Sequence, residues 1–479
     1  FYHSLNKISK LIILFGLLIS FYSFFFFMSN KVFLIGSDAF YYMSIADSIV
    51  KYGEMRDITA IPSFPVKTPQ NGIVFVHVIL SLFGLGAKGR ILTIVVINYL
   101  LYLSGVYPLY KIARWSGLRK GLPLIALLSV YLGAWHIYRI NLLAINDGIF
   151  NSLTLWLVYF IIKFVREINL AESISLSRPI FMKIILISVI VVVLVQFRLN
   201  AALVIGSALI AALALRDYKA SLFFISACVL LLISFGAVYL FVGVVGLENV
   251  VERSFFPMFR AIKIGNIKLQ LWYILPRLVA GLSGLTNPLA TLIFTIFPLS
   301  MMYYGIRGLI RKNFSEVFIA SICLTGLWFT MSFQNARVIW YTFPFIYLIL
   351  LGIKSIRFAG YAFVFLVFLQ SIQQFTIGFP RGPQSRLWLH VYDHNISLPQ
   401  NALLSSYNRR HPYYFLGTRN YLGDDSWGEI LKQISAPGKF MPKLTWDLVN
   451  EHGSLFVMGD STYIASAYSQ VQDMATSNG

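Results

Sequence analysis

The sequence predicts a multispan α-helical membrane protein with helices along its outer surface and a small C-terminal α/β domain. Three observations lead to this fold class: the apolar composition, the length of the apolar runs, and the position of basic residues between them. Of 479 residues, 58% are apolar and 12% are charged, and the mean hydropathy is +0.72. A soluble domain averages about 45–50% apolar and about 25% charged residues. The composition therefore excludes a soluble globule, a disordered chain and a disulfide scaffold.

The apolar runs predict about eleven membrane spans. A crossing helix needs about 17–25 mostly apolar residues, so run length is the first test. The run from 72 to 86 has only about 15 residues, the length expected of a re-entrant or interfacial helix. The runs that we interpret as spans are 11–29, 91–110, 122–139, 148–163, 180–197, 199–215, 220–245, 286–305, 315–333, 339–353 and 358–377.

Basic residues fix the expected orientation of these spans. The formal net charge is +20, but the basic residues separate apolar runs instead of sharing one polar face, so we expect membrane lipids and no nucleic acid as partners. With the N-terminus inside, every short inner segment carries at least two Lys or Arg residues, as the positive-inside rule requires. These segments are 1–10, 111–121, 163–183, 216–219, 306–314 and 354–357.

This orientation divides the chain into two predicted domains. Residues 1–377 form the transmembrane domain, with a first outer loop at 30–90 that carries two juxtamembrane helices and a second outer loop at 246–285. Residues 378–479 form an outer domain, in which strand-like and helix-like runs alternate as in a small α/β fold. These pieces are an apolar run at 402–405, helix-like runs at 427–434 and 446–449, and a strand-like run at 454–458. Because the sequence begins with Phe1, we expect further residues before it.

The first outer loop opens with a predicted amphipathic helix over 36–53, which Gly53 would end. One face is mostly apolar and the other mostly polar, so we expect the helix to lie along the outer surface. The apolar face carries Tyr42, Ile45, Ala46, Ile49 and Tyr52, and the other face carries Tyr41, Ser44, Ser48 and Lys51.

Two acidic residues lie on this helix. Asp38 stands at its start, directly after the first span. Its position alone favours a helix cap, since Asp is a preferred N-cap residue, and a catalytic carboxylate is the alternative. Asp47 is expected to be a solvated helix residue.

The string Ser37-Asp38-Ala39-Phe40-Tyr41-Tyr42, followed by Ala46 and Gly53, resembles the first outer loop of the GT-C superfamily of multispan glycosyltransferases. Those enzymes use polyprenyl-phosphate sugars as donors, and an Asp after the first span is their catalytic residue. The resemblance covers roughly residues 10–377, and the layout is similar to that of aminoarabinose transferases and protein O-mannosyltransferases. Further segments that resemble the family, in the same order, are the Pro-rich stretch 61–72, Tyr138-Arg139, Asn146-Asp147, Arg198-Leu199-Asn200, and Arg337 with Tyr341 and Pro344.

The resemblance implies a set of site residues. Asp38 would be the catalytic base, and Asp147 a second catalytic acidic residue that orients the acceptor or a metal, with a helix cap as its alternative. Arg337 would bind the donor phosphate, because a guanidinium fork suits a phosphate, with a snorkelling interfacial arginine as its alternative. Further candidates for the phosphate are Arg139, Arg198, Arg260 and Lys263, the last two within a basic outer loop that could also contact lipid headgroups, and the substrate pocket would include Tyr41, Tyr42 and Tyr341.

The chemistry of glycosyl transfer suits these residue types. A carboxylate takes the proton of the acceptor hydroxyl, and cations stabilise the departing phosphate. One carboxylate that acts directly on the acceptor implies inversion at the anomeric carbon. No cofactor is expected, and a divalent cation has no support from spacing, because His77, His136 and His390 are scattered and the two cysteines lie in apolar runs.

Two departures from the family narrow the acceptor. Oligosaccharyltransferases of this superfamily carry a Trp-Trp-Asp motif, and only Thr445-Trp446-Asp447 and Asp425-Ser426-Trp427 come near it. Protein O-mannosyltransferases carry an acidic pair after the first span, whereas Ala39 follows Asp38 here. We therefore expect a transferase of the bacterial inner membrane that acts at the periplasmic face on a lipid, glycan or protein acceptor.

Two other classes of function stay open. A polysaccharide polymerase or ligase also uses lipid-linked glycans and Arg-rich outer loops, but it usually lacks a C-terminal soluble domain. A transporter would show inverted repeats and ionisable residues at the membrane midplane. Here the ionisable residues gather at the expected outer rim, which disfavours a transporter.

Overall fold

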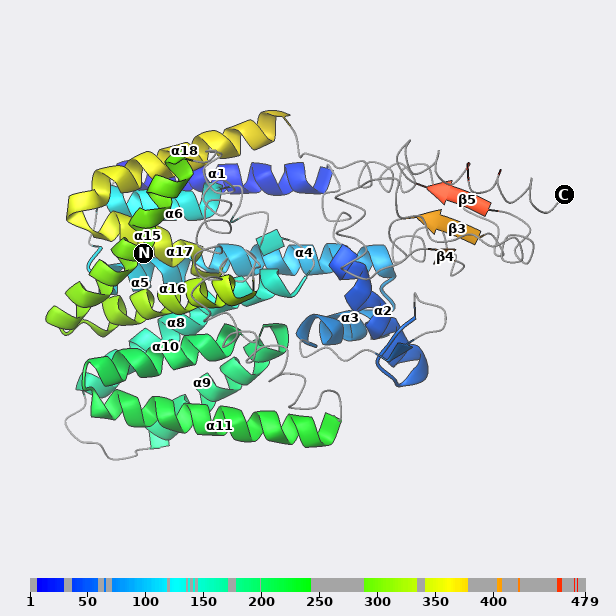
Figure 1. Cartoon of the computed structure of the whole chain (residues 1–479), viewed down its shortest axis with the longest axis horizontal. Coiled ribbons are helices and arrows are strands. Elements are labelled where there is room, and N and C mark those ends of the chain that lie inside the picture. The colour runs from blue at the N-terminus through cyan, green and yellow to red at the C-terminus, as the bar shows by residue number, and fades with distance from the viewer. Residues whose placement is uncertain are drawn as a thin grey trace. The chain divides into compact units, whose positions relative to one another are not determined.

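The structure is a computed structural model of the chain (Figure 1). It describes residues 7–29, 37–58, 64–65, 71–118, 121–134, 137, 141–142, 145–170, 178–198, 200–242, 288–333, 341–377, 403–406, 421–422, 455–458, 469 and 472. The elements are α1 (Lys7–Ser29), α2 (Ser37–Tyr52), β1 (Arg56–Asp57), β2 (Phe64–Pro65), α3 (Gly72–Leu82), α4 (Ala87–Ser104), α5 (Val106–Trp115), α6 (Leu122–Gly133), α8 (Asn146–Leu170), α9 (Arg178–Phe197), α10 (Asn200–Ala214), α11 (Tyr218–Val242), α15 (Pro288–Ile310), α16 (Phe314–Phe333), α17 (Phe343–Gly352), η5 (Lys354–Ile356), α18 (Arg357–Ile377), β3 (Leu403–Ser406), β4 (Tyr421–Leu422) and β5 (Leu455–Met458).

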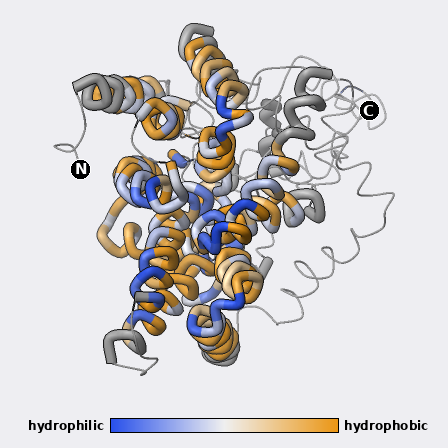
Figure 2. The backbone as a smooth tube through the Cα atoms, turned by 90° about the vertical axis from the view of Figure 1, so that its left-hand side faces the viewer, coloured by the Kyte–Doolittle hydropathy of each residue, from blue (hydrophilic) through white to orange (hydrophobic). Residues whose placement is uncertain are grey.

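The structure has a helix at each run interpreted as a span, and apolar residues dominate these helices (Figure 2). In the described part of the chain, two helices are long and apolar enough to cross a membrane, Ala87–Trp115 and Asn146–Asn169. A third is added if α17 and the helix after it, which meet at a bend of 95°, count as one span. In the other apolar helices, the stretches whose side chains the structure describes have 10–17 residues. The chain therefore has apolar helices of the membrane type, and the number of eleven spans stays a prediction.

The chain divides into two compact units, which are described separately. The first unit comprises Phe1–Phe26, Thr68–Gly72 and Val95–Gly378, and the second comprises Phe27–Lys67, Ile73–Ile94 and Phe379–Gly479. In the first unit, α15 packs on α16, α16 on α10, and α10 on α11, while α8 packs on α5 and α9. This unit corresponds to most of the predicted transmembrane domain.

Polar contacts join several of the predicted inner segments at one end of the first unit. The Tyr304 hydroxyl donates to the Ser116 carbonyl at 3.1 Å, and Arg307 Nη1 donates to the Gly352 carbonyl at 3.0 Å. The Arg166 guanidinium stacks over Trp115 with 5.4 Å to the ring centroid. Asn169, one turn farther along α8, donates to Asp217 at 2.9 Å. Predicted inner segments that are distant in the sequence therefore lie at the same end of the first unit, which agrees with the charge pattern.

In the second unit, α2 packs against α3 through an apolar cluster. Ile45, Ala46 and Val74 are fully buried at its centre. The half-buried residues around them are Tyr41, Tyr42, Ile49, Met55 and Val78. The predicted end of this helix is confirmed, because Gly53 has φ +70° and its N–H donates to the Ile49 carbonyl at 2.9 Å.

The expectation that α2 lies along the outer surface is wrong for its polar face. Ser44 and Ser48 are fully buried, and only the last residues of the helix are well exposed, with Val50 at 43% and Tyr52 at 50%. The amphipathic pattern identified one packed face. It did not identify the second, because small hydroxyl side chains can be buried. Ser44 Oγ donates to the Tyr41 carbonyl at 2.9 Å, whereas Ser48 Oγ has no partner among the described residues.

The described strands of the C-terminal region form a three-stranded parallel sheet in the order β4-β3-β5. β3 pairs with β5 from Leu403 opposite Leu455 to Ser406 opposite Met458. β5 lies at the run predicted to be strand-like, and β3 lies at the apolar run 402–405. Parallel neighbours need crossover connections. The helix-like runs at 427–434 and 446–449 lie outside the described residues, so the α/β domain stays a prediction.

Candidate functional site

A buried ion pair joins two of the segments singled out from the sequence. Asp147 lies in the first turn of α8, and Arg198 directly follows the last residue of α9. Arg198 Nη2 donates to Asp147 Oδ1, although 51 residues separate the two. The carboxylate side chain is 4% exposed and the guanidinium side chain 16%. A buried pair of this kind has lost the hydration of both charges, so each depends on the other.

The guanidinium of Arg198 has spare hydrogen-bonding capacity. Its Nε is buried and has no hydrogen-bond partner among the residues that the structure describes. An arginine offers five N–H donors in a fixed fork, so a guanidinium that is held by a carboxylate can still donate to an anion. Arg198 is therefore chemically able to hold a phosphate while Asp147 orients it.

Buried asparagines lie close to residues that neighbour this pair in the sequence. Asn98 on α4, Asn141 and Asn200 are 0%, 5% and 5% exposed. Gly148, in the first turn of α8, lies between the first two of them, since a Cβ there would overlap the Asn98 amide and lie 2.6 Å from the Asn141 carbonyl oxygen. Only a glycine permits such a close approach. Polar side chains at membrane depth are costly, which makes them candidates for function.

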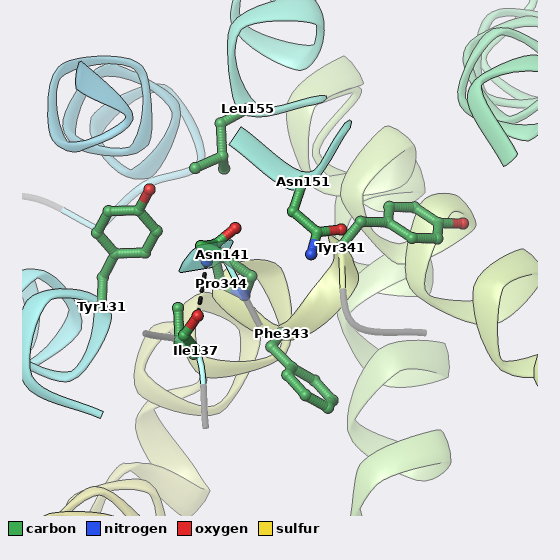
Figure 3. Close-up of a pocket in the computed structure, with 8 residues that line it drawn as sticks. All are labelled: Tyr131, Ile137, Asn141, Asn151, Leu155, Tyr341, Phe343 and Pro344. Carbon is green, nitrogen blue, oxygen red and sulfur yellow. Dashed lines mark hydrogen bonds between the residues drawn. The ribbon is translucent and has the colours of Figure 1, made fainter. Parts of the chain in front are cut away.

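A small pocket lies next to these asparagines (Figure 3). It has room for about one water molecule. Asn141 Nδ2 donates to the Ile137 carbonyl at 2.8 Å, while its Oδ1 has no partner within the described part of the chain. Figure 3 shows the amides of Asn141 and Asn151 between the rings of Tyr131 and Tyr341. The lining residues are Tyr131, Ile137, Asn141, Asn151, Leu155, Tyr341, Phe343 and Pro344.

The pocket brings together segments that are far apart in the sequence. Ile137 and Asn141 flank the Tyr138-Arg139 segment, Asn151 lies one turn after Asp147, and Tyr341 belongs to the late segment. The Tyr341 ring is buried and meets Phe150 edge to face at 5.6 Å between centroids. Its hydroxyl points away from the asparagines in Figure 3. Tyr341 thus contributes its ring to the pocket wall.

Comparisons with known proteins add little. No protein-family model matches the sequence. No curated protein matches it. Among solved structures, the chain is similar to the crystal structure of an Archaeoglobus fulgidus oligosaccharyltransferase tethered by a disulfide bond to an acceptor peptide containing the NVT sequon, with 11% identity and a TM-score of 0.40. The match covers 80% of this chain and 59% of that chain, so this chain spans less than two thirds of its length. A similarity this low does not establish a shared fold.

The second unit contains the other group of predicted site residues. Asp38 lies in the first turn of α2. Tyr41 and Tyr42 follow it, are half-buried, and pack against the apolar cluster between α2 and α3. Their rings lie 5.6 Å apart. Both tyrosines therefore support the position of α2, and their predicted contact with substrate stays a prediction.

Asp47 is not the solvated residue that the sequence suggested. Arg90, in the first turn of α4, donates from Nη1 to Asp47 Oδ1 at 2.6 Å and from Nη2 to Oδ2 at 3.2 Å. The arginine side chain is 5% exposed and the aspartate side chain 23%. Arg90 was missed because the apolar run was taken to begin at residue 91. An arginine directly before an apolar run is a weak signal, because most such residues are interfacial anchors.

His77 on α3 is a further buried residue near Arg90. It is fully buried, and neither ring nitrogen has a hydrogen-bond partner in the described part of the structure. Burial, together with the charge of Arg90, lowers the pKa of His77 to about 3. The imidazole is therefore neutral at physiological pH, which leaves the positive charge beside Asp47 to Arg90.

Several predicted site residues cannot be placed. Arg139, Arg260, Lys263 and Arg337 lie outside the described residues. Among all the residues that the structure describes, no three His, Cys, Asp or Glu side chains lie close enough together to hold a metal ion. Asn98, Asn141 and Asn151 were missed by sequence reasoning. Their only signal is a polar residue within or beside an apolar run, which does not say which of them meet.

Proposed function

We propose that the chain is an integral-membrane glycosyltransferase that moves one sugar from a polyprenyl-phosphate donor to an acceptor on the outer face of the membrane, with inversion. The observation that carries the proposal is the contact between Asp147 and Arg198. One turn after Asp147 on α8, Asn151 lines the pocket that Tyr341 and Pro344 also line. Except for Asn151, each of these residues lies in a segment that resembles a GT-C motif. Their proximity is what a shared site for donor and acceptor requires.

The proposed reaction uses one carboxylate as a base. Asp38 takes the proton of the acceptor hydroxyl while the acceptor oxygen forms a bond to the anomeric carbon. The bond from that carbon to the phosphate oxygen breaks on the opposite face, and polyprenyl phosphate leaves with the bonding electrons. The proton on Asp38 then passes to water. Attack opposite the leaving group inverts the anomeric centre.

Cationic side chains would stabilise the departing phosphate. Arg198 is a candidate because its Nε is unused by described residues and Asp147 holds its fork in place. In this role Asp147 is a positioning residue for the arginine. Arg337, Arg139, Arg260 and Lys263 remain candidates for the same phosphate. Asn141 and Asn151 are suited to bind a sugar hydroxyl, since each offers both a donor and an acceptor.

The test is turnover by the purified chain of a panel of undecaprenyl-phosphate monosaccharides, read out as released undecaprenyl phosphate. We expect Asp38→Asn to lower turnover by about 100-fold or more, the range for a general base. The control is Glu54→Gln, an exposed carboxylate of the same loop. Full turnover by Asp38→Asn would overturn the proposal.

The product distinguishes the alternatives. A single added sugar supports the transferase, whereas a ladder of repeats would indicate a polymerase. Accumulation of an unmodified sugar lipid in vesicles, with no covalent change, would indicate a transporter.

A further inference from the structure

We propose that Asp47 and Arg90 form a clamp that fixes the position of α2 and so positions Asp38 for its role as a base. This inference rests on the proposed function for its catalytic consequence, and on the structure alone for the clamp. Asp47 and Arg90 are positioning residues in it, because neither needs to touch substrate. All three residues belong to the second unit.

The contact has the geometry of a specific clamp. Both terminal nitrogens of Arg90 reach the two carboxylate oxygens of Asp47, at 2.6 and 3.2 Å. Two parallel hydrogen bonds fix direction as well as distance, which a single ionic contact does not. The pair joins residues that are 43 positions apart, on different helices. It therefore sets how α2 lies against the beginning of α4.

The clamp acts on the face of α2 opposite its contacts with α3, a face that also carries the buried Phe40 and Met43. Ile45 and Ile49 pack towards Val74 and Val78 of α3. Asp47 lies two residues from each isoleucine, about 200° around a helix with about 100° per residue, and so on the opposite face. Apolar contacts are not directional, so by themselves they leave a helix free to rotate or slide by small amounts. The ion pair removes that freedom.

Burial of the arginine makes the pair costly unless it serves a purpose. The Arg90 side chain is 5% exposed, and its Nε is buried with no partner among described residues. Replacing such a pair by apolar residues is often neutral or stabilising, so its presence favours a role in specificity over one in stability. Fixing one register of α2 is such a role.

Asp38 responds to this register because α2 is one continuous helix from Ser37 to Tyr52. Nine residues separate Asp38 from Asp47, which is about 14 Å along a helix that rises about 1.5 Å per residue. A rotation of α2 at Asp47 therefore turns Asp38 as well. Displacement of a catalytic group by about 1 Å can cost about 100-fold in rate.

The kinetic test compares Arg90→Lys and Arg90→Gln with Arg56→Gln in the undecaprenyl-phosphate assay, with turnover expressed per folded molecule. Arg56 is a matched control, since it pairs with Glu54 at 2.5 Å in the same loop but is 44% exposed. We expect kcat to fall at least tenfold for Arg90→Gln and about fivefold for Arg90→Lys, with KM for the donor within twofold. Arg56→Gln should match wild type. Because a merely structural pair would leave kcat of the folded fraction unchanged, wild-type kcat in both Arg90 variants would overturn the clamp.

A second measurement tests the clamp without any activity. Hydrogen–deuterium exchange of the full chain reports how firmly α2 is held. Arg90→Gln should speed exchange of the amides from Ser37 to Tyr52 at least tenfold relative to Arg56→Gln. Unchanged exchange in α2 would overturn the clamp. If wild type turns over none of the sugar lipids, the proposed function fails while the exchange result still decides the clamp.

Discussion

The described part of the first unit contains two buried arginine–carboxylate pairs, one towards each end of α8, and their surroundings differ. At the end where predicted inner segments meet, Arg307 Nε donates to Glu316 at 2.9 Å and Nη1 to the Gly352 carbonyl at 3.0 Å. Its guanidinium also stacks over Tyr304 at 4.5 Å. At the other end, Arg198 contacts Asp147, and its Nε has no partner in the described part of the chain.

The difference indicates which pair has a structural role and which is available for chemistry. Glu316 is 1% exposed, and its partner bridges α15, α16 and the end of α17, so this pair joins elements. Near the pair at the other end, Asn141 lines a small pocket, and its Oδ1 has no partner among the described residues. Buried polar groups are normally satisfied, so the unused donor of Arg198 makes this pair the better candidate for binding a ligand.

The largest expected loss of stability is at the buried pairs, beginning with Arg307 and Glu316. Glu316→Gln leaves the Arg307 charge buried without its counter-ion, and we expect a loss of about 3–5 kcal/mol in the free energy of unfolding. Unfolding of the purified chain in detergent measures it. Donor turnover per folded molecule should stay within twofold of wild type. A loss of turnover without a loss of stability would reverse the roles assigned to the two ends.

The matched change at the pair of Arg198 and Asp147 is Asp147→Asn. The amide still accepts a hydrogen bond from Arg198, but the buried guanidinium loses its counter-ion, as Arg307 does in Glu316→Gln, so we expect a similar loss of stability, about 3–5 kcal/mol. Donor turnover should fall at least tenfold, because the orientation of Arg198 changes. The two substitutions therefore differ in their effect on turnover and not in their effect on stability. Wild-type turnover in Asp147→Asn would remove the functional assignment of this end.

Gly148→Ala tests the close packing next to Asp147, which pairs with Arg198. The new Cβ would overlap the Asn98 amide and lie 2.6 Å from the Asn141 carbonyl oxygen, and we expect the overpacking to cost about 1–3 kcal/mol. Gly206→Ala on α10 is the control, since a Cβ there meets nothing within 4 Å. That control should stabilise the helix by up to about 1 kcal/mol. If the two substitutions changed the free energy of unfolding equally, the packing of Gly148 against Asn98 and Asn141 would be loose.

The smallest expected effect on stability is at Arg311, an exposed residue beside the pair of Arg307 and Glu316. Arg311 lies 3.9 Å from Glu316 but is 61% exposed. Exposed ion pairs contribute little, so Arg311→Gln should change the free energy of unfolding by less than about 0.5 kcal/mol. A loss as large as that of Glu316→Gln would mean that Arg311, and not Arg307, holds the carboxylate.

Much of the helical layout could be predicted from the sequence. Helices lie at the apolar runs, and Lys and Arg mark segments that meet at one end of the first unit. Gly53 ends α2 as expected, and β5 of the C-terminal sheet lies at the strand-like run 454–458. These features depend on hydropathy, charge and turn geometry, which are properties of short stretches of chain.

The pairing of polar residues could not be predicted in the same way. The sequence suggested Asp147 and Arg198 as separate site residues, and Asp47 as a solvated one. Only the tertiary structure joins Asp147 to Arg198 across 51 residues, and Asp47 to Arg90 across 43. Which donor meets which acceptor depends on how the helices pack, and helix packing is set by side chains from all of them together. The sequence by itself determined where the helices form and which end carries the basic segments, whereas the tertiary structure decided which buried charges are saturated and which are left with capacity to bind.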